Sequence, residues 1–435
     1  MHNNRQSSIV NRDKSLDYAG ALAFLYPRTT SIKFGLGRTH ALLEALGRPE
    51  RVYPTVHVGG TNGKGSVAAL VAAGLREAGW RTGLYTSPHL VSFRERIRVD
   101  GVPISEEAVA MWVQRLRALV EALDATFFEV STAIALADFA ARGAEIAVVE
   151  VGLGGRLDST NVIQPLASGV TKIELDHQKY LGDSLEAIAA EKAAIAKPGA
   201  PFVIGETRPE LVEVLRREAD QKQADVRVLP AEARWEGPLA LLGPHQRRNA
   251  EVARALLWAL PTPWRPTEVD IERAFARTRV PGRLDRRGKW LFDVAHNPDG
   301  MRSLVAAIKG GEGGEGGKGG KGGAGLGLRR PIHALVSILG DKAWPEMLVE
   351  LDRGVDRGVL TIAPSADTRK WDLAWLEDWL RDPTRPPATA RWALVPDFDE
   401  ALLRVQEGAG TVVVTGSFHT VGDVMNVLGM ADVTA

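Results

Sequence analysis

The chain has 435 residues and a mass of 47.0 kDa, a length at which two domains are the usual expectation. Basic and acidic residues number 54 each, so the overall charge does not favour a nucleic acid or a membrane surface as partner. The absence of cysteine excludes disulfides, zinc thiolates, iron–sulfur clusters and a thiol nucleophile. Met1 to Val10 lacks the apolar core of a signal peptide, and no run approaches the roughly 20 apolar residues of a membrane span, so we expect a cytoplasmic protein.

Short β-branched runs alternate with longer Ala- and Leu-rich runs, the pattern of parallel strands joined by crossover helices. In the first half, we predict strands at 54–58, 82–85, 146–151, 167–171 and 202–205, and helices at 66–78, 107–123, 129–142 and 185–196. After an irregular stretch at 231–244 and a helix at 249–260, further strands are predicted at 289–294, 332–338, 358–361 and 411–414. The break predicts a boundary near Val280, with domains at 1–279 and 280–435.

A glycine-rich segment interrupts the second half. Gly310 to Leu328 reads GGEGGEGGKGGKGGAGLGL. Glycine at this density has much backbone entropy and little apolar surface to bury, so the segment is predicted to be a flexible surface loop inserted between a helix and a strand.

The strongest local signal is His57 to Ser66, HVGGTNGKGS, between an apolar strand and a helix. Glycine-rich turns expose successive backbone N–H groups, and a helix N-terminus adds partial positive charge. Lys64 would supply a cation for nucleotide phosphates, and Ser66 could bind magnesium. Because Gly65 separates Lys64 from Ser66, the match to G-x-x-x-x-G-K-[ST] is not literal, and a ligand-free turn is the alternative.

Polar residues follow the neighbouring predicted strands. Ser87 lies in YTSPHL after one strand, Glu150 closes another, and His177 follows a third. Ligands of open α/β folds bind at the carboxyl ends of strands, and a carboxylate beside a phosphate loop is well placed for magnesium. Taken singly, Glu150 could be a solvated strand end, His177 a structural residue and Lys192 a surface charge.

Taken together and in order, these motifs resemble the folylpolyglutamate synthase/dihydrofolate synthase family, a branch of the Mur ligases. The shared segments are HVGGTNGKGS, YTSPHL, EVGLGGRLDSTN, LDH followed by LG, IAAEKAAI, GPHQ, PGRL, DVAHNP and TGS. The resemblance covers nearly the whole chain. It implies an α/β fold: a P-loop-containing, Mur-ligase-like ATPase domain with a mostly parallel central sheet, followed by a smaller Rossmann-like C-terminal domain.

The resemblance also implies roles for individual residues. The phosphate cradle would be Gly63, Lys64, Gly65 and Ser66, and further ATP contacts would be Asn249, Arg283 and Asp293. Two magnesium ions would be held by Ser87, Glu150, His177 and Lys192, and the catalytic residues would be Lys64, Glu150, His177 and Lys192. Lys192 matches a family lysine that is carbamylated, a change that turns a cation into a carboxylate-like metal ligand. The pterin-bearing substrate is expected at Ile32, Lys33, Phe34 and Gly35, at Thr126, Phe127, Phe128 and Glu129, and at Leu157, Asp158 and Ser159.

The activity implied is that of an ATP-dependent amide ligase. It would add L-glutamate to dihydropteroate and to the γ-carboxyl of tetrahydrofolate glutamates through an acyl phosphate, using ATP, Mg²⁺ and a monovalent cation. The partners would be dihydropteroate, reduced folates and L-glutamate, and the enzyme would act as a monomer. The alternatives are only one of these two activities, a Mur-type muropeptide ligase, or a non-biosynthetic ATP switch. A further alternative is a Rossmann-type NAD enzyme, which only the partial dinucleotide turn Gly152-x-Gly154-Gly155 supports.

Overall fold

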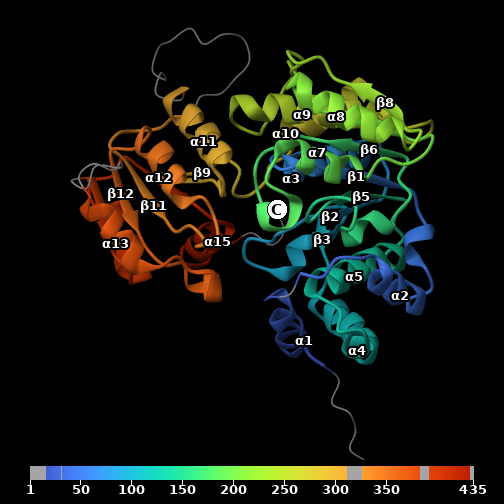
Figure 1. Cartoon of the computed structure of the whole chain (residues 1–435), viewed down its shortest axis with the longest axis horizontal. Helices are drawn as coiled ribbons and strands as arrows, with labels where there is room; N and C mark the ends of the chain where they lie inside the picture. The colour runs from blue at the N-terminus through green and yellow to red at the C-terminus, as the bar shows by residue number, and fades with distance from the viewer. Residues whose placement is uncertain (1–15, 31, 311–325, 383–390, 432–435) are drawn as a thin grey trace, which may run out of the picture.

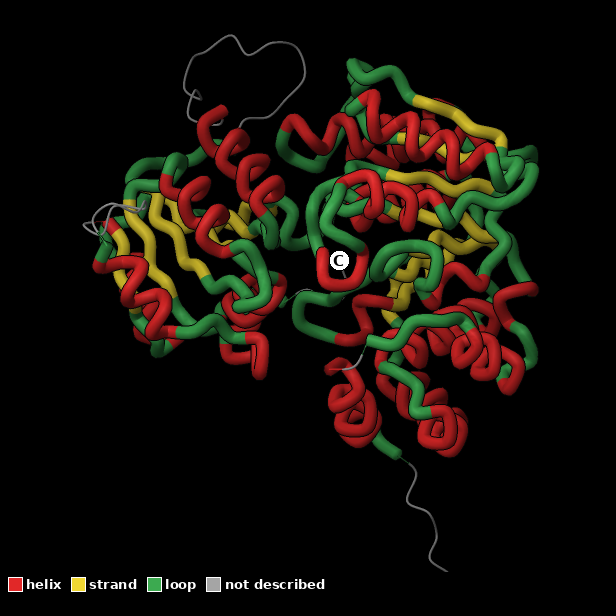
Figure 2. The backbone as a smooth tube through the Cα atoms, in the orientation of Figure 1, coloured by secondary structure: helices red, strands yellow, loops and turns green. Residues whose placement is uncertain are grey.

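The computed structural model describes residues 16–30, 32–310, 326–382 and 391–431. Two β-sheets lie side by side along the longest axis of the molecule (Figure 1). Helices flank the strands of both sheets (Figure 2). Strands of the first sheet lie within 55–228 and those of the second within 285–415. Most of the glycine-rich segment, 311–325, lies outside the described residues, so its predicted flexibility stays a prediction.

The first sheet has eight strands in the order β4-β3-β2-β5-β1-β6-β7-β8. Six are parallel: β1 (Thr55–Gly59), β2 (Thr82–Tyr85), β5 (Ile146–Glu150), β6 (Ala167–Val170), β7 (Pro201–Ile204) and β8 (Asp225–Val228). The antiparallel edge consists of β3 (Ile97–Val99) and β4 (Val102–Pro103). Because the central strands are parallel, their carboxyl ends share one edge of the sheet.

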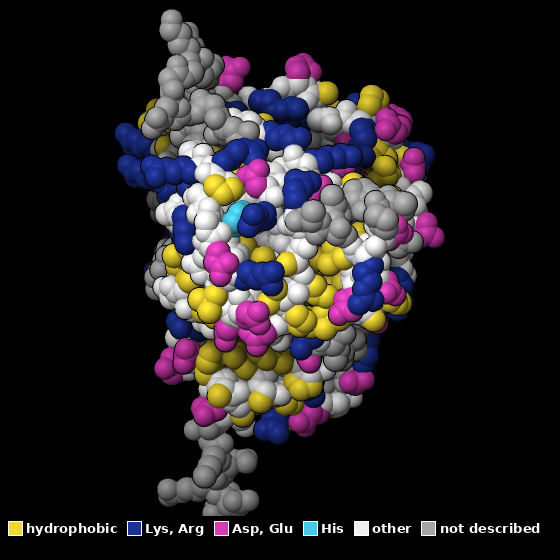
Figure 3. Space-filling view, turned by 90° about the vertical axis from the view of Figure 1, so that its left-hand side faces the viewer, with side chains coloured by type: hydrophobic (Ala, Val, Ile, Leu, Met, Phe, Trp, Pro, Cys, Tyr) yellow, Lys and Arg dark blue, Asp and Glu magenta, His cyan; other side chains and the backbone are white. Residues whose placement is uncertain are grey.

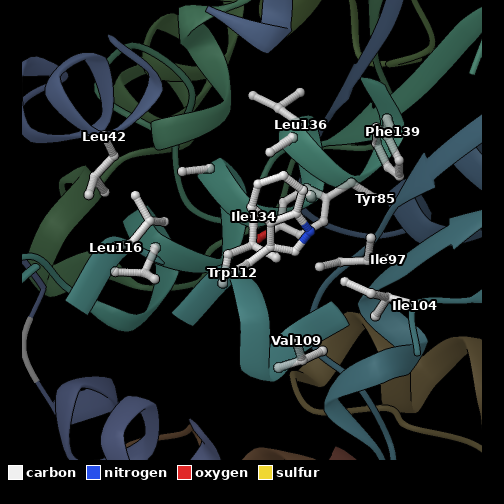
Figure 4. Packing of buried hydrophobic residues seen from close by; sticks show 14 of the residues in the cluster. Leu42, Tyr85, Ile97, Ile104, Val109, Trp112, Leu116, Ile134, Leu136 and Phe139 are labelled. Carbon is white, nitrogen blue, oxygen red and sulfur yellow. The ribbon is translucent and has the colours of Figure 1, made fainter. Parts of the chain in front are cut away.

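Successive residues of the central strands point to opposite faces of this sheet. Val56 and Val58 pack with α3 (Lys64–Glu77), α9 (Pro244–Ala259) and α10 (Glu268–Arg277). The other face is covered by α5 (Phe127–Ala141), α7 (Leu185–Ala193) and α8 (Pro209–Asp220). On α5 pack α2 (Gly37–Ala45) and α4 (Glu106–Leu123), and α1 (Tyr18–Leu25) packs on α4. Figure 4 shows part of this second core, in which Tyr85 and Phe139 are at most 1% exposed. The odd-numbered His57 therefore points into the α5 side of the sheet.

The second sheet has six strands in the order β13-β12-β11-β14-β10-β9. Its strands are β13 (Trp392–Leu394), β12 (Arg357–Leu360), β11 (Ile332–Val336), β14 (Thr411–Thr415), β10 (Trp290–Phe292) and the antiparallel β9 (Asp285–Arg287). One face is covered by α11 (Pro298–Gly310), α12 (Trp344–Asp352) and α13 (Leu373–Arg381), the other by α14 (Phe398–Gln406) and α15 (Phe418–Val427). Charged side chains of both signs are scattered among apolar and other side chains on the outer end of this domain (Figure 3).

The predicted α/β class and mostly parallel sheets are confirmed, and each predicted strand is present. Several helix boundaries differ from prediction. The helix expected at 249–260 begins at Pro244, and the helix expected at 66–78 begins at Lys64. The helix expected at 129–142 begins at Phe127, because Thr126 and Glu129 form a capping box. The helix expected at 185–196 ends at Ala193. In the part of the chain that the structure describes, no helix is both long enough and apolar enough to cross a bilayer.

Candidate active site

The polar residues predicted at strand ends meet at the carboxyl edge of the first sheet. The glycine-rich loop follows β1, Ser87 follows β2, Glu150 ends β5, and Asp176 and His177 come after β6. These are four adjacent strands in the order β2-β5-β1-β6. The topology therefore brings together side chains that are more than a hundred residues apart.

The loop after β1 has the backbone shape of an anion site. Gly60 and Gly63 have φ values of +134° and +93°, which favour glycine. A Cβ built at Gly63 would lie 2.5 Å from Oδ1 of Asn249, so the predicted ATP contact on α9 borders the loop. Helix α3 begins at Lys64, and its first N–H groups have no partner within the helix. These groups, which include those of Gly65 and Ser66, are available to an anion.

Two lysines lie against this loop. Nζ of Lys64 donates to the carbonyl of Thr61 at 3.0 Å, and Nζ of Lys192 donates to the carbonyl of Gly60 at 2.9 Å. Burial lowers the pKa of Lys64, although Glu150 acts in the opposite direction. Burial and the charge of Lys64 lower the pKa of Lys192 to about 7. A substantial fraction of Lys192 is therefore a neutral amine at neutral pH.

Glu150 is a buried carboxylate with few donors. It is 3% exposed, and its Oε2 accepts a hydrogen bond from the Ser87 backbone N–H at 2.9 Å. Burial raises its pKa, opposed by the charges of Lys64 and Arg283. A Cβ built at Gly65 would lie 3.6 Å from Oε1, so the carboxylate borders the phosphate loop. A buried, incompletely compensated carboxylate beside an anion site fits a divalent cation.

Asp176 and His177 line the other side of the site. His177 has a φ of +53° and precedes α6 (Gln178–Leu181). Loss of solvation and the charge of Lys342 lower its pKa to about 4, so the imidazole is neutral at pH 7. Asp176 accepts a hydrogen bond from Lys342 at 2.5 Å and lies 3.6 Å from Nε2 of His296. Although burial raises it, the pKa of Asp176 falls well below its usual value because of these partners.

The four predicted metal ligands do not by themselves form a closed cage. Within residues 16–30, 32–310, 326–382 and 391–431, no three His, Asp or Glu side chains are grouped to hold a metal ion. The backbone N–H of Ser87 contacts Glu150 directly. Lys192 instead contacts Gly60 of the glycine-rich loop, and His177 lies near Lys342 of the second domain.

The second domain contributes Arg283 and Asp293. Asp293 is 8% exposed and accepts hydrogen bonds from the backbone N–H groups of Leu284 at 2.9 Å and Ala295 at 3.0 Å. Burial raises its pKa to about 6, and the nearby Arg283 guanidinium opposes this shift. Arg283 also interacts electrostatically with Glu150. The guanidinium therefore links the carboxylates of the two domains.

A direct polar contact between the domains was missed by sequence reasoning. Asn62, inside the phosphate loop, exchanges hydrogen bonds with Asn297 at 2.9 and 3.3 Å and donates to Asp299 at 2.9 Å. Lys172 donates to the same aspartate at 2.5 Å. Asn297 belongs to the DVAHNP motif, which indicated family membership, but no local pattern indicated its partner in the loop.

A cavity of about 600 Å³ lies between the two domains beside these contacts. Its lining comes from 175–180 of the first domain and from 296–298, 340–344, 369–370, 372 and 375 of the second. His177, Lys342 and Trp375 therefore face one shared space.

The three predicted substrate windows are neighbours. Helix α2, which follows Ile32 to Gly35, packs on α5 and on η4 (Ser159–Val162). A Cβ built at Gly152 would lie 2.3 Å from the ring of Phe128, at the start of α5. The ring of Phe34, which is 48% exposed, lies 6.1 Å from that of Tyr180.

Within these windows, several side chains already have protein partners. Lys33 pairs with Asp124, and Glu129 binds both Thr126 and Arg38. Phe127 is 7% exposed and packs against Phe93, and Leu157 is half-buried. Asp158 accepts hydrogen bonds from Leu153 and Thr160 of its own loop. Phe34 and Phe128 thus remain the accessible aromatic faces in the first two windows.

Comparisons with known proteins agree with this geometry. Residues 58–233 match the family model of the Mur ligase middle domain. The chain is 31% identical to the dihydrofolate synthase/folylpolyglutamate synthase of Bacillus subtilis, over 94% of this chain and 98% of the relative. It superposes on E. coli FolC in complex with DHPP and ADP with a TM-score of 0.80, at 29% identity over 95% and 98% of the two chains. A bifunctional folylpolyglutamate synthase/dihydrofolate synthase with Mn, AMPPNP and L-glutamate bound gives 0.78, with the same identity and coverage.

Proposed function

The chain belongs to the dihydrofolate synthase/folylpolyglutamate synthase family, and we propose that it is an ATP-dependent ligase with both activities. It joins L-glutamate to dihydropteroate and to the γ-carboxyl of tetrahydrofolate glutamates. The observation that carries this proposal is the meeting of a phosphate-binding turn, two lysines and the buried carboxylate Glu150 at one sheet edge. Relatives named for both activities, and one structure with L-glutamate bound, support the choice of substrates.

The reaction has to overcome the poor reactivity of a carboxylate. A carboxylate oxygen attacks the γ-phosphorus of ATP, the bond to ADP breaks, and an acyl phosphate forms. The neutral α-amine of glutamate then attacks the acyl carbon, phosphate leaves, and the amine loses a proton as the amide forms. Phosphoryl transfer depends on alignment and on neutralisation of oxygen charge rather than on a covalent enzyme intermediate.

The residues of the site divide this work. The N–H groups of Gly63, Gly65 and Ser66 bind phosphate oxygens, and the ammonium of Lys64 offsets their charge. Asn249 borders the same loop, while Arg283 and Asp293 hold the nucleotide from the second domain. Closing the cavity between the domains keeps water from the acyl phosphate.

Magnesium fits the same edge. Ser87, Glu150, His177 and Lys192 would hold it, and the bound ion would supply charge neutralisation at the phosphate oxygens. The relative with Mn and AMPPNP supports a divalent cation beside the nucleotide. Since His177 is neutral at pH 7, it can serve as a ligand. A monovalent cation is a further expectation for this site.

Lys192 has the properties needed for carbamylation. Only a neutral amine attacks CO₂, and the pKa of about 7 makes this form abundant. The new N–C bond gives a carbamate and releases one proton, which replaces a cation by an anionic oxygen ligand. The resulting group would complete the ligand set that unmodified side chains leave open.

The pterin-bearing substrate is proposed to lie among Ile32 to Gly35, Thr126 to Glu129 and Leu157 to Ser159, where the exposed ring of Phe34 and the half-buried ring of Phe128 can stack on a planar ligand. The division at 279/280 would then place this pocket and the phosphate loop in one domain and Arg283 and Asp293 in the other. We further propose that the enzyme acts as a monomer in the cytoplasm, where ATP is available.

The direct test is ADP formation with dihydropteroate or tetrahydrofolate, each with and without L-glutamate, with the products identified by mass. We expect ADP release with either acid to require glutamate and to yield the corresponding amide. Amide formation from only one of the two acids would show that the enzyme has only one of the two proposed activities. ADP release independent of both acid and glutamate would contradict the proposal and favour an ATP switch.

A further inference from the structure

A buried chain of hydrogen bonds runs from the central strand to the proposed substrate pocket. Nε2 of His57, on β1, lies 2.8 Å from Oγ1 of Thr160 on η4. The same hydroxyl donates to Oδ1 of Asp158 at 2.5 Å. His57 and Thr160 are 0% exposed and Asp158 is 5% exposed. The predicted ATP and metal roles use neither His57 nor Thr160.

The direction of each hydrogen bond follows from the groups involved. Asp158 accepts from the backbone N–H groups of Thr160 and Leu153, so its oxygens act as acceptors. The single hydroxyl proton of Thr160 then goes to Asp158, and His57 has to donate its Nε2–H to Thr160. This leaves Nδ1 of His57 as the deprotonated nitrogen, and that atom is buried with no hydrogen-bond partner among the described residues.

The chain of hydrogen bonds ends on the backbone next to the ring of Phe128, which belongs to the proposed substrate pocket. Asp158 accepts from Leu153 N–H at 2.8 Å and also interacts with the Gly152 amide. Gly152 in turn lies under the ring of Phe128, too close to admit a Cβ. With its oxygens used in this way, the Asp158 carboxylate shapes the loop at 152–158.

We propose that His57 and Thr160 are positioning residues: through Asp158 they fix the backbone at Gly152 and Leu153, and hence the place of the Phe128 ring against the substrate. The inference rests on the proposed function for the identity of that substrate. Neither residue touches the reacting atoms. Their substitution is expected to change the KM for the acid substrate and not the KM for ATP. Glu150 and the phosphate loop are held by other hydrogen bonds, those from Ser87 N–H and from Lys64.

The test compares three variants that differ by one hydroxyl or one methyl group. Thr160→Val removes the relay hydroxyl, and Thr160→Ser keeps it. Thr55→Val is the matched control, because Thr55 is buried on the same face of β1 and its hydroxyl has no partner among the described residues. We expect Thr160→Val to raise the KM for dihydropteroate at least tenfold with the KM for ATP within twofold. Thr160→Ser and Thr55→Val should stay near wild type. Unchanged kinetics of Thr160→Val, or an equal rise in both KM values, would overturn the proposal.

Two readouts need no turnover, so they separate this inference from the proposed function. In the wild type, ¹⁵N resonances of the His57 ring should show a protonated Nε2 and an unprotonated Nδ1. In Thr160→Val, the amides of Gly152 and Leu153 should exchange hydrogen at least tenfold faster than in Thr55→Val. The opposite tautomer, or unchanged exchange, would refute the relay even if the enzyme makes the expected product. If Thr160→Val does not fold, the tautomer in the wild type decides.

Discussion

The proposed phosphate edge and the proposed pterin pocket are built in different ways. At the phosphate edge, Lys64, Ser87 and Glu150 each sit within two residues of a strand or helix end, and parallel strand order brings them together. In the pocket, Phe34 precedes α2 and Phe128 lies in the first turn of α5. Their segments are brought near each other by the packing of α2 on α5, and the loop held by Asp158 lies against Phe128. The first region depends on sheet topology, and the second depends on side chains that hold loops in place.

The comparison predicts that substitutions at the phosphate edge reduce turnover with every acid substrate. Substitutions in the pocket should change only the KM for the acid. Glu150 borders the loop proposed to bind phosphate, so its loss should slow the chemical step whichever acid is bound. Gly152 lies against the ring of Phe128, so a substitution of Gly152 should change only how the acid substrate fits the pocket.

The largest expected effect is that of Glu150→Gln. The amide can still accept from Ser87 N–H, so the fold should persist, but the charge that holds the metal is lost. We expect glutamate-dependent ADP formation to fall by about a thousandfold with either acid, since electrostatic groups at this kind of site contribute factors of that order. The assay is steady-state ADP release, with the thermal unfolding midpoint as control. Near-normal turnover would remove the role assigned to Glu150.

Lys192→Ala should reduce turnover about a hundredfold, because the proposed ligand set would lose its carbamate. In the wild type, activity should fall as the pH drops through about 7, because protonation of the Lys192 amine prevents its reaction with CO₂. At pH 6.5, where protonation limits carbamylation, adding bicarbonate as a source of CO₂ should raise the activity of the wild type. The activity of Lys192→Ala should not respond. His177 does not explain a loss in this range, since its pKa is about 4. A wild type unaffected by bicarbonate and an unmodified lysine in its mass spectrum would contradict carbamylation.

A smaller and more selective effect is expected from Gly152→Ala. The new Cβ would lie 2.3 Å from the Phe128 ring, so the ring must move. We expect the KM for dihydropteroate to rise about tenfold, the equivalent of roughly 1.4 kcal/mol, while the KM for ATP stays within twofold. Gly310→Ala is the control, because Gly310, like Gly152, has no positive φ and a Cβ there would meet nothing within 4 Å. A parallel rise in the KM for ATP would show that the two regions are not independent.

The smallest effect is expected on the glycine-rich segment. Deleting 311–325 should leave both KM values and turnover within a few-fold, because glycine-rich sequence has little apolar surface to bury. The measurement is the same ADP assay at matched protein concentration. A loss above tenfold would show that the segment takes part in the reaction or in folding.

The sequence signal is more local at the phosphate edge than in the pocket, for a physical reason. The turn after β1 carries its signal locally, since Gly63 and Lys64 stand next to each other between a strand and a helix. Edge strands such as β3 and β8 were missed because they are short and half-polar. The links between Asn62 and Asn297, 235 residues apart, depend on how two domains dock, which no local pattern encodes.

The fate of the carboxylate oxygen tests the phosphorylation of the substrate most directly. Dihydropteroate labelled with ¹⁸O in its carboxylate would be converted with ATP and L-glutamate, and the released phosphate analysed by mass. Transfer of the γ-phosphoryl group to the carboxylate predicts one ¹⁸O atom in each phosphate and one retained in the new amide. Unlabelled phosphate accompanying amide formation would contradict it.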